Sequence, residues 1–179
     1  LGMSRGLGDV YKRQGKGEAV HLFTRDCSLQ RKYQKIIEEA PALNIDNQKL
    51  EEIQNLSVEA CKKLNYEGAG TIEFLYENND FYFIEMNTRI QVEHTVTEMI
   101  TGVDLVQAQL LLALENKYDF KQEDLKVNGH AMQCRINAED PETFVPSPGR
   151  IERVHRPGGY HVRFESQIYS GYQVPANYD

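Results

Sequence analysis

The stretch Phe81-Tyr-Phe-Ile-Glu-Met-Asn-Thr-Arg-Ile-Gln-Val-Glu-His94 decides the fold prediction for this chain. Successive side chains of an extended chain point to opposite faces, so the stretch would present one apolar and one polar face. A solvated edge strand alternates in the same way, but its wet face typically carries Lys, Thr and Ser. The polar face here would instead carry carboxylate, amide and guanidinium groups, which favours a binding face: Glu85, Asn87, Arg89, Gln91 and Glu93.

A second strand pattern, residues 71–76, precedes this stretch and is joined to it by the turn cluster 77–80. If the two strands pair so that residue numbers sum to 158, the apolar residues face one another and Glu73 lies opposite Glu85. The apolar pairs would then be Ile72 with Met86, Phe74 with Ile84, and Tyr76 with Tyr82. Because the sum is even, the connection needs an odd number of unpaired residues or a β-bulge.

Two directly opposed carboxylates repel each other unless a cation lies between them. Glu73, Glu85 and the amide of Asn87 offer only oxygen ligands, which suit a hard cation such as Mg²⁺ or Mn²⁺. A Mg²⁺ ion held by one or two carboxylates usually completes its shell with phosphate and water. The register therefore predicts a metal site that works together with a phosphate ligand.

The composition is that of an ordinary globular protein, with 179 residues, 40% of them hydrophobic and 26% charged. The net charge is −7 without a basic block, which argues against nucleic-acid binding. Cys27, Cys61 and Cys134 are scattered and form no CxxC pair, so we expect reduced thiols and a cytoplasmic location. The longest apolar run, residues 110–114, is far too short to span a membrane.

Helical periodicity predicts an amphipathic helix over residues 46–64 with Asp46 as its N-cap. Two further helices are expected after the hairpin, one to Ile100 that opens on a Thr95–Glu98 capping box and one from Asp104 through residue 114. The polar stretch 115–126 is the expected domain boundary. Beyond it, residues 150–155 and 160–165 are predicted to form a strand pair.

The run 83–94, followed by residues 97–105, resembles the signature of the biotin carboxylases, which are ATP-grasp ligases. The resemblance extends from about Gly15 to the end and implies an α+β fold. Residues 15–127 would be the C-terminal part of an ATP-grasp domain, an antiparallel sheet with helices, and 128–179 the truncated, strand-rich start of the biotin carboxylase C-terminal domain. Residues 1–14 fall outside the resemblance and look like a non-native, translated adapter artefact or a flexible terminus, so we expect them to be irregular.

The resemblance also implies roles in nucleotide binding. Glu73, Glu85 and Asn87 would hold the metal ions that bridge the ATP phosphates. Tyr33 departs from the family pattern, because many relatives have histidine at this position near the ribose. The full set expected to contact ATP is Gln30, Tyr33, Lys35, Glu73 and Glu85.

The remaining roles concern bicarbonate and biotin. Arg89 offers a fork of donors that matches the planar bicarbonate anion, and Glu93 would act as general base or, more simply, pair with Arg89. Arg135 would stabilise the biotin enolate or serve as a structural ion pair. It would lie on a strand beside the 85–93 segment, opposite the packed side chains of Met132, Cys134 and Ile136. The expected bicarbonate ligands are Lys35, Arg89 and the backbone at Gln91 and Val92.

A protein of this family uses ATP, with Mg²⁺ or Mn²⁺, and bicarbonate to carboxylate biotin on a carrier protein. The implied partners are the biotin carboxyl carrier protein and a carboxyltransferase, and the implied full-length state is a homodimer. Acetyl-CoA carboxylase in fatty acid biosynthesis, propionyl-CoA carboxylase and pyruvate carboxylase are all compatible with the residues. No nucleic acid or membrane partner is expected.

Two alternatives remain open at this point. The family's amino-terminal domain, glycine-rich lid and adenine-side lysine have no counterpart in the sequence, so the chain alone is expected to be inactive and could serve as a binding or dimerisation module. Another ATP-grasp ligase, such as carbamoyl phosphate synthetase, shares the paired acids and the asparagine. It gives no reason for the run from Arg89 to His94 followed by residues 134–140.

Overall fold

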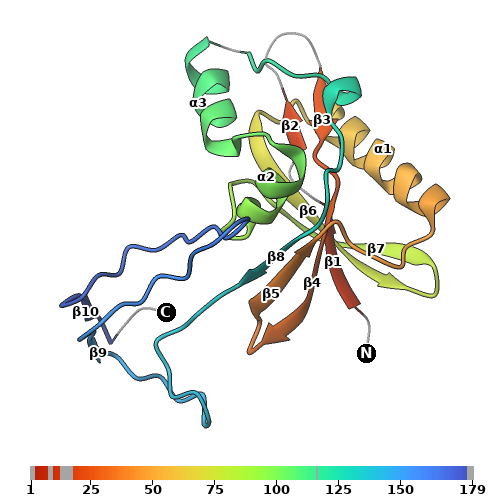
Figure 1. Ribbon diagram of the computed structural model, residues 1–179. Helices are drawn as coiled ribbons and strands as arrows, with labels where there is room; N and C mark the ends of the chain where they lie inside the picture. Colours follow the sequence, from red (N-terminus) through yellow and green to blue (C-terminus); the bar gives the residue numbers. More distant parts are fainter. Residues whose placement is uncertain (1–2, 8–9, 13–17, 116, 177–179) are drawn as a thin grey trace. The chain divides into compact units, whose positions relative to one another are not determined.

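The computed structural model describes residues 3–7, 10–12, 18–115 and 117–176. The chain divides into two compact units, residues 1–135 and 136–179, so the structural boundary falls eight residues after the expected one at 127/128. In the first unit an antiparallel sheet carries helices, as the resemblance implied (Figure 1). Its elements are β1 (Met3–Leu7), β2 (Val10–Lys12), β3 (Ala19–His21), β4 (Thr24–Arg31), β5 (Gln34–Ala40), α1 (Asn47–Lys63), β6 (Gly68–Glu77), β7 (Asp80–Asn87), α2 (His94–Thr101), α3 (Leu105–Glu115), the 3₁₀ turn Gln122–Asp124 and β8 (Ala131–Cys134).

Strand β6 organises the sheet, whose order is β3-β2-β6-β1-β4-β5-β8 with β7 on the other edge of β6. Residues 68–70 of β6 pair with β2 and residues 73–76 pair with β1. The expectation that residues 1–14 are irregular is therefore wrong for 3–7 and 10–12. A buried strand needs partners for its backbone N–H and C=O groups on both edges, and these residues supply them on one edge. The side chains of Val10 and Tyr11 lie outside the described residues, and the origin of the segment stays a prediction.

The β6–β7 hairpin has the predicted register at its far end and a different one near the turn. Glu73 lies opposite Glu85, but Phe74 faces Phe83 and not Ile84, and Tyr76 faces residue 81. The turn explains the difference. Asn78 and Asn79 both have positive φ, as a tight two-residue hairpin turn requires, and this turn imposes an odd sum. A bulge at Ile84 restores the even sum, so the predicted irregularity is confirmed.

In the part of the chain that the structure describes, the helices pack on both faces of the sheet around three apolar clusters. Helix α1 begins after Asp46, whose carboxylate accepts the Lys49 N–H as predicted, and buries Cys61 against Ile72 and Phe74 of β6. Helix α3 packs Leu105, Ala108 and Leu112 against Leu22 and Ala69, on the face toward which the odd-numbered residues of β6 point. That face also carries Glu73. Helix α1 packs against the opposite face of β6, so it lies behind the polar site.

Helix α2 differs from the prediction at its first turn. The expected capping box is absent, because the N-cap position is Glu93 and Glu98 accepts the N–H of Leu105 at 2.6 Å. Gly102 ends the helix in the left-handed region, φ 72°, as a glycine C-cap does. Among the described residues no single helix is long and apolar enough to cross a membrane, and only α2 and α3 taken together, bent by 93°, pass that test of length and composition.

The second unit has little regular structure in its described part. Its strands there are β9 (Gly149–Arg150) and β10 (Gln173–Val174), which pair with each other, so the predicted strand pair at 150–155 and 160–165 is wrong. A strand is stable when one face is buried, and nearly every residue from 152 to 165 is exposed. "Strand-rich" is therefore corrected to a loop-rich unit.

Candidate active site

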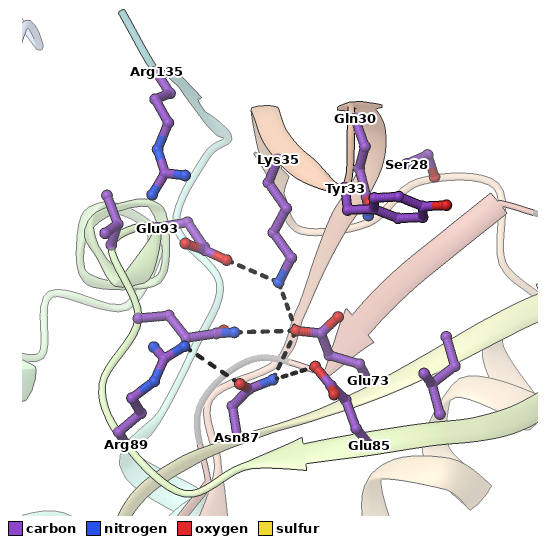
Figure 2. A pocket seen from close by; sticks show the side chains of 13 residues that line it. Ser28, Gln30, Tyr33, Lys35, Glu73, Glu85, Asn87, Arg89, Glu93 and Arg135 are labelled. Carbon is purple, nitrogen blue, oxygen red and sulfur yellow. Dashed lines mark hydrogen bonds and ion pairs between the residues drawn. The ribbon is translucent and has the colours of Figure 1, made fainter. Parts of the chain in front are cut away.

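All eleven residues predicted from the sequence as site residues line one cavity of about 670 Å³ in the first unit (Figure 2). Two further lining residues were not predicted. The bulge brings Ile84 to the cavity. The odd register sum that a two-residue turn imposes could have predicted this bulge from the sequence. Ser28 lies on β4, where its hydroxyl donates to Asp26, and the sequence offered no signal for it.

The predicted residues after Asn87 reach the cavity through a turn and not through the alternating side chains of one strand. Strand β7 ends at Asn87, and residues 88–93 form a turn that leads into α2. Arg89, Gln91 and Glu93 therefore do not lie on one extended face. They reach the cavity because the turn bends them back over Glu73 and Glu85. Gln91 and Glu93 are buried, whereas Val92 between them is exposed.

Strands β4 and β5 form the opposite wall. Their hairpin turns at Lys32 and Tyr33, which both have positive φ, and this places Gln30, Tyr33 and Lys35 along the cavity. Tyr33 at the tip is fully exposed. The Gln30 amide donates to the Cys27 carbonyl at 2.9 Å, which fixes its side chain near the hairpin.

Lys35 connects two parts of the site (Figure 2). Its ammonium lies 2.6 Å from Glu73 Oε1 and 2.8 Å from Glu93 Oε1. Burial disfavours the charge, but Cys27, Glu73 and Glu93 outweigh it and raise the pKa of Lys35 above its usual value. Burial acts to raise the pKa of Glu93, yet Lys35 and Arg25 hold it below its usual value, so the carboxylate is ionised at neutral pH. Glu93 therefore pairs with Lys35 and not with Arg89, contrary to the simpler expectation.

Three donors converge on one oxygen of Glu73. Besides Lys35, the side-chain amides of Asn87 and Gln91 each donate to Oε1 at 3.0 Å. The same Asn87 nitrogen lies 3.0 Å from Glu85 Oε1, so it bridges the two opposed carboxylates. These contacts hold the two carboxylates together despite their mutual repulsion.

The donor set fits a divalent cation. Glu73, Glu85 and Asn87 lie together, and the Asn87 amide nitrogen takes the electrostatic role between the carboxylates that a cation would take. Rotation of that amide would present its oxygen, a ligand suited to Mg²⁺ or Mn²⁺. Among the described residues no group of three or more His, Cys, Asp or Glu side chains could hold a metal. Two carboxylates and an amide leave room for phosphate and water, as Mg²⁺ prefers.

Arg135 follows directly after the predicted strand, but that strand pairs with β5 and not with the 85–93 segment. Strand β8 pairs with β5, the strand that carries Lys35, and the Arg135 N–H donates to the Ile36 carbonyl at 2.9 Å. The guanidinium is turned toward Glu93, as predicted (Figure 2). The expected packing of Met132, Cys134 and Ile136 is wrong, because all three are exposed, Met132 by 58% and Ile136 by 88%. The half-buried residues of β8 are instead Ala131 and Gln133.

A buried arginine and a buried carboxyl group contact each other behind the site. Arg25 Nε is 3.0 Å from Glu38 Oε1, and both side chains are almost completely inaccessible to solvent. Burial is the largest influence on Glu38 and exceeds the attraction of Arg25, so it raises the pKa of Glu38 to about 8. Sequence reasoning missed both residues, because a charged residue in a strand is usually solvated.

The raised pKa predicts how stability depends on pH. Between the ordinary carboxyl pKa of about 4.5 and the folded value of about 8, the folded chain holds a proton that the unfolded chain has released. The free energy of unfolding therefore falls as pH rises through this window, by up to about 1.4 kcal/mol per pH unit. Glu38→Gln should remove this slope. Urea denaturation from pH 5 to pH 8.5 measures it, and a difference between wild type and variant that is constant with pH would contradict the assignment.

Comparison with known proteins identifies the family in which this arrangement of residues occurs. A family model described as the ATP-binding domain of the carbamoyl-phosphate synthase L chain matches residues 11–121, and one for the biotin carboxylase C-terminal domain matches 133–179. The biotin carboxylases of Pseudomonas aeruginosa and Haemophilus influenzae are 59% and 61% identical to the chain over 165 and 163 residues. The chain belongs to the biotin carboxylase family. These matches cover 92% and 91% of the chain but only 37% and 36% of the relatives, so the chain spans a little over a third of their length.

Solved structures agree with this membership of the biotin carboxylase family. A Campylobacter jejuni biotin carboxylase complex superposes with a TM-score of 0.93 and 46% identity, covering 99% of this chain and 40% of that one. The biotin carboxylase domain dimer of Hydrogenobacter thermophilus 2-oxoglutarate carboxylase gives 0.94 and 45%, covering 99% and 39%. That structure is described as a complex with MgADP, ADP and bicarbonate. The α+β, ATP-grasp fold of the sequence prediction is thus confirmed, as is membership of an ATP-dependent ligase family.

Proposed function

We propose that this chain forms the metal-, bicarbonate- and biotin-facing part of a biotin carboxylase, which uses ATP to carboxylate biotin on a carrier protein. The observation that carries the proposal is the position of Lys35 between Glu73 and Glu93. These residues line a cavity that Arg89 and Arg135 also line. Phosphoryl transfer depends mostly on positioning and charge neutralisation, and this cavity supplies cationic and anionic groups in fixed positions.

The nucleotide side of the cavity would take ATP with Mg²⁺ or Mn²⁺. Glu73, Glu85 and Asn87 would hold the metal, which when bound neutralises charge on the phosphates. Lys35 already ion-pairs with two carboxylates, so it is placed to contact a phosphate beside them. Gln30 and Tyr33, on the β4–β5 hairpin, would contact the nucleoside, with a phenol where many relatives have an imidazole.

Bicarbonate would bind at the turn before α2. The Arg89 guanidinium matches its planar shape, and the backbone at Gln91 and Val92 would complete the pocket. Glu93 is ionised at neutral pH and can accept the bicarbonate proton. The bicarbonate oxygen would then attack the terminal phosphorus of ATP, and the bond to the β-phosphate would break, giving carboxyphosphate and ADP.

Biotin would be carboxylated next to Arg135. The ureido nitrogen of biotin is very weakly acidic, and negative charge develops on the ureido oxygen as the proton leaves. A guanidinium at that oxygen stabilises the charge where it forms. Arg135 is half-buried, so part of its hydration is already removed before biotin arrives.

The proposal extends to partners and setting. The biotin substrate would be carried by a biotin carboxyl carrier protein, and a carboxyltransferase would consume the product. The full-length protein would be a cytoplasmic homodimer belonging to an acetyl-CoA, propionyl-CoA or pyruvate carboxylase. A neighbouring structure is described as a biotin carboxylase domain dimer, which supports the expected oligomeric state.

The proposal is tested in an exchange protein, the Pseudomonas aeruginosa relative in which the 165 matched residues are replaced by those of this chain. Glu85→Gln should lower bicarbonate-dependent ADP release by about 100-fold at low Mg²⁺, because one of two carboxylate ligands is lost. Raising the Mg²⁺ concentration should recover part of the rate. Glu77→Gln, which changes an exposed carboxylate on the same hairpin, is the matched control. Equal rates for Glu85→Gln and the control would contradict the metal assignment.

A further inference from the structure

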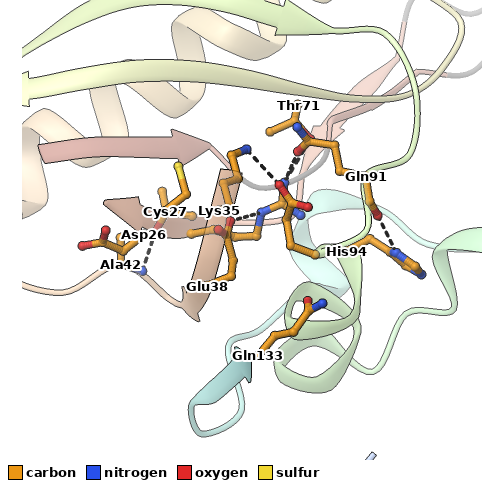
Figure 3. A network of polar contacts seen from close by, with 12 residues as sticks. Asp26, Cys27, Lys35, Glu38, Ala42, Thr71, Gln91, His94 and Gln133 are labelled. Atoms are coloured by element: carbon orange, nitrogen blue, oxygen red, sulfur yellow. Dashed lines mark hydrogen bonds and ion pairs between the residues drawn. The ribbon is translucent and has the colours of Figure 1, made fainter. Parts of the chain in front are cut away.

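Gln91 lies at the centre of contacts that the proposed reaction does not yet explain. Its side chain is only 6% exposed, although it belongs to a turn at the edge of an open cavity. Its amide oxygen accepts a hydrogen bond from Arg25 Nη2, and its amide nitrogen donates to Glu73 Oε1 at 3.0 Å (Figure 3). Its backbone carbonyl lies 2.7 Å from Nδ1 of His94. The residue is thus held at three different atoms.

The chemistry of the partners allows one orientation of the Gln91 amide. A guanidinium only donates hydrogen bonds, so the amide oxygen must face Arg25. An ionised carboxylate only accepts, so the amide N–H must face Glu73. A backbone carbonyl also only accepts, so His94 must carry its proton on Nδ1. Arg25 therefore determines which group of Gln91 points at the proposed metal ligand.

Arg25 is itself fixed by its surroundings. Its side chain is completely buried on β4, and Nε pairs with Glu38 at 3.0 Å. The Nη2 atom that donates to Gln91 also donates to Thr71 Oγ1 at 3.1 Å, and Thr71 lies two residues before Glu73 on β6. Arg25 therefore bridges three strands and the turn: β4, β5, β6 and residue 91. Because these contacts leave the Arg25 side chain little freedom, it can hold Gln91 in one orientation.

We propose that Arg25 is a positioning residue that orients Gln91, and that Gln91 in turn holds both Glu73 and the backbone of residues 91–93 in the geometry that bicarbonate requires. The second part of this inference, the effect on bicarbonate binding, rests on the proposed function. The first part, the orientation of Gln91, can be tested without any reaction. Arg25 does not line the cavity, so it acts on bicarbonate through residues that do: Gln91 by direct contact and Glu93 by its charge.

The orientation is tested by NMR on the 179-residue chain labelled with ¹⁵N-glutamine. The Gln91 side-chain amide is assigned by its disappearance in Gln91→Ala, and exposed Gln48 is the internal reference. In the wild type the Gln91 amide protons should exchange with water at least tenfold more slowly than those of Gln48. Arg25→Met should abolish this protection, whereas Thr71→Val, which removes only the second acceptor of Nη2, should retain it. Unchanged protection of Gln91 in Arg25→Met would overturn the proposal.

A second variant covers the case in which Arg25→Met fails to fold. Arg25→Lys keeps a positive charge for Glu38 but lacks the planar fork whose second nitrogen reaches Gln91. Its folded spectrum should show an unprotected Gln91, and a protected Gln91 there would equally overturn the proposal. The comparison separates orientation from charge.

The consequence for the reaction is tested in the exchange protein. Arg25→Lys should raise KM for bicarbonate about tenfold and leave KM for MgATP within twofold, whereas Thr71→Val should leave both unchanged. A general loss of fold would not produce this split. If both KM values stay at the wild-type level, the role in bicarbonate binding is wrong. If the wild-type exchange protein carboxylates no biotin, the proposed function fails, while the NMR result still decides the orientation of Gln91.

Discussion

Replacing Lys35 by methionine in the exchange protein is expected to lower the rate of biotin carboxylation by about 100- to 1,000-fold, the size of effect seen when a preorganised charged group is removed from an active site. The ammonium contacts Glu73 at 2.6 Å and Glu93 at 2.8 Å, and both carboxylates are buried. Without the Lys35 ammonium, the negative charges of Glu73 and Glu93 are less well balanced by positive charge. One of them would then take up a proton and lose its function as metal ligand or base.

The same substitution should destabilise the fold. Removing one partner of a buried ion pair costs about 3–5 kcal/mol, and the lower end applies here because the Lys35 side chain is 16% exposed. Urea denaturation and steady-state carboxylation measure the two effects. Lys49→Met, which removes an exposed ammonium paired with Asp80, is the control and should change neither by much. A Lys35→Met protein with carboxylation within twofold of wild type would remove Lys35 from the site.

Replacing Arg135 by alanine should produce a similar loss of rate with a different kinetic pattern. The carboxylation rate should fall by about 100- to 1,000-fold, while KM for MgATP stays within twofold, because the guanidinium is needed only where charge develops on biotin. Lysine should restore little activity, since it lacks the planar fork. Arg153→Ala, at an exposed position of the second unit, is the control. Normal carboxylation by Arg135→Ala would show that this arginine has only a structural role.

The sequence indicated which residues line the cavity better than it indicated the paths that bring them together. The pairing of Glu73 with Glu85 followed from apolar matching, because a shift of one residue would mix the two faces. The exact partners of Phe74 and Tyr76 depended on the Asn78–Asn79 turn, whose backbone geometry outweighs side-chain preference close to it. Local turn chemistry and the long-range register are reconciled by the bulge at Ile84.

Contacts between distant segments were the least predictable part. Lys35 is 38 residues from Glu73 in the sequence, and nothing local indicates that it lies between two carboxylates. Nothing in the sequence singled out Arg25 and Glu38, which the structure places in the interior. The strands at residues 3–7 and 10–12 were missed for a related reason, because their pairing is determined by the free edge of β6 and not by their own pattern.

We propose that this chain supplies the metal, bicarbonate and biotin groups of a biotin carboxylase. The most direct measurement is the transfer of ¹⁴C from labelled bicarbonate to biotin by the wild-type exchange protein, with and without ATP. We predict ATP-dependent carboxybiotin formation within about tenfold of the rate of the parent Pseudomonas aeruginosa protein. A folded exchange protein that binds MgATP but forms no labelled carboxybiotin would contradict the claim.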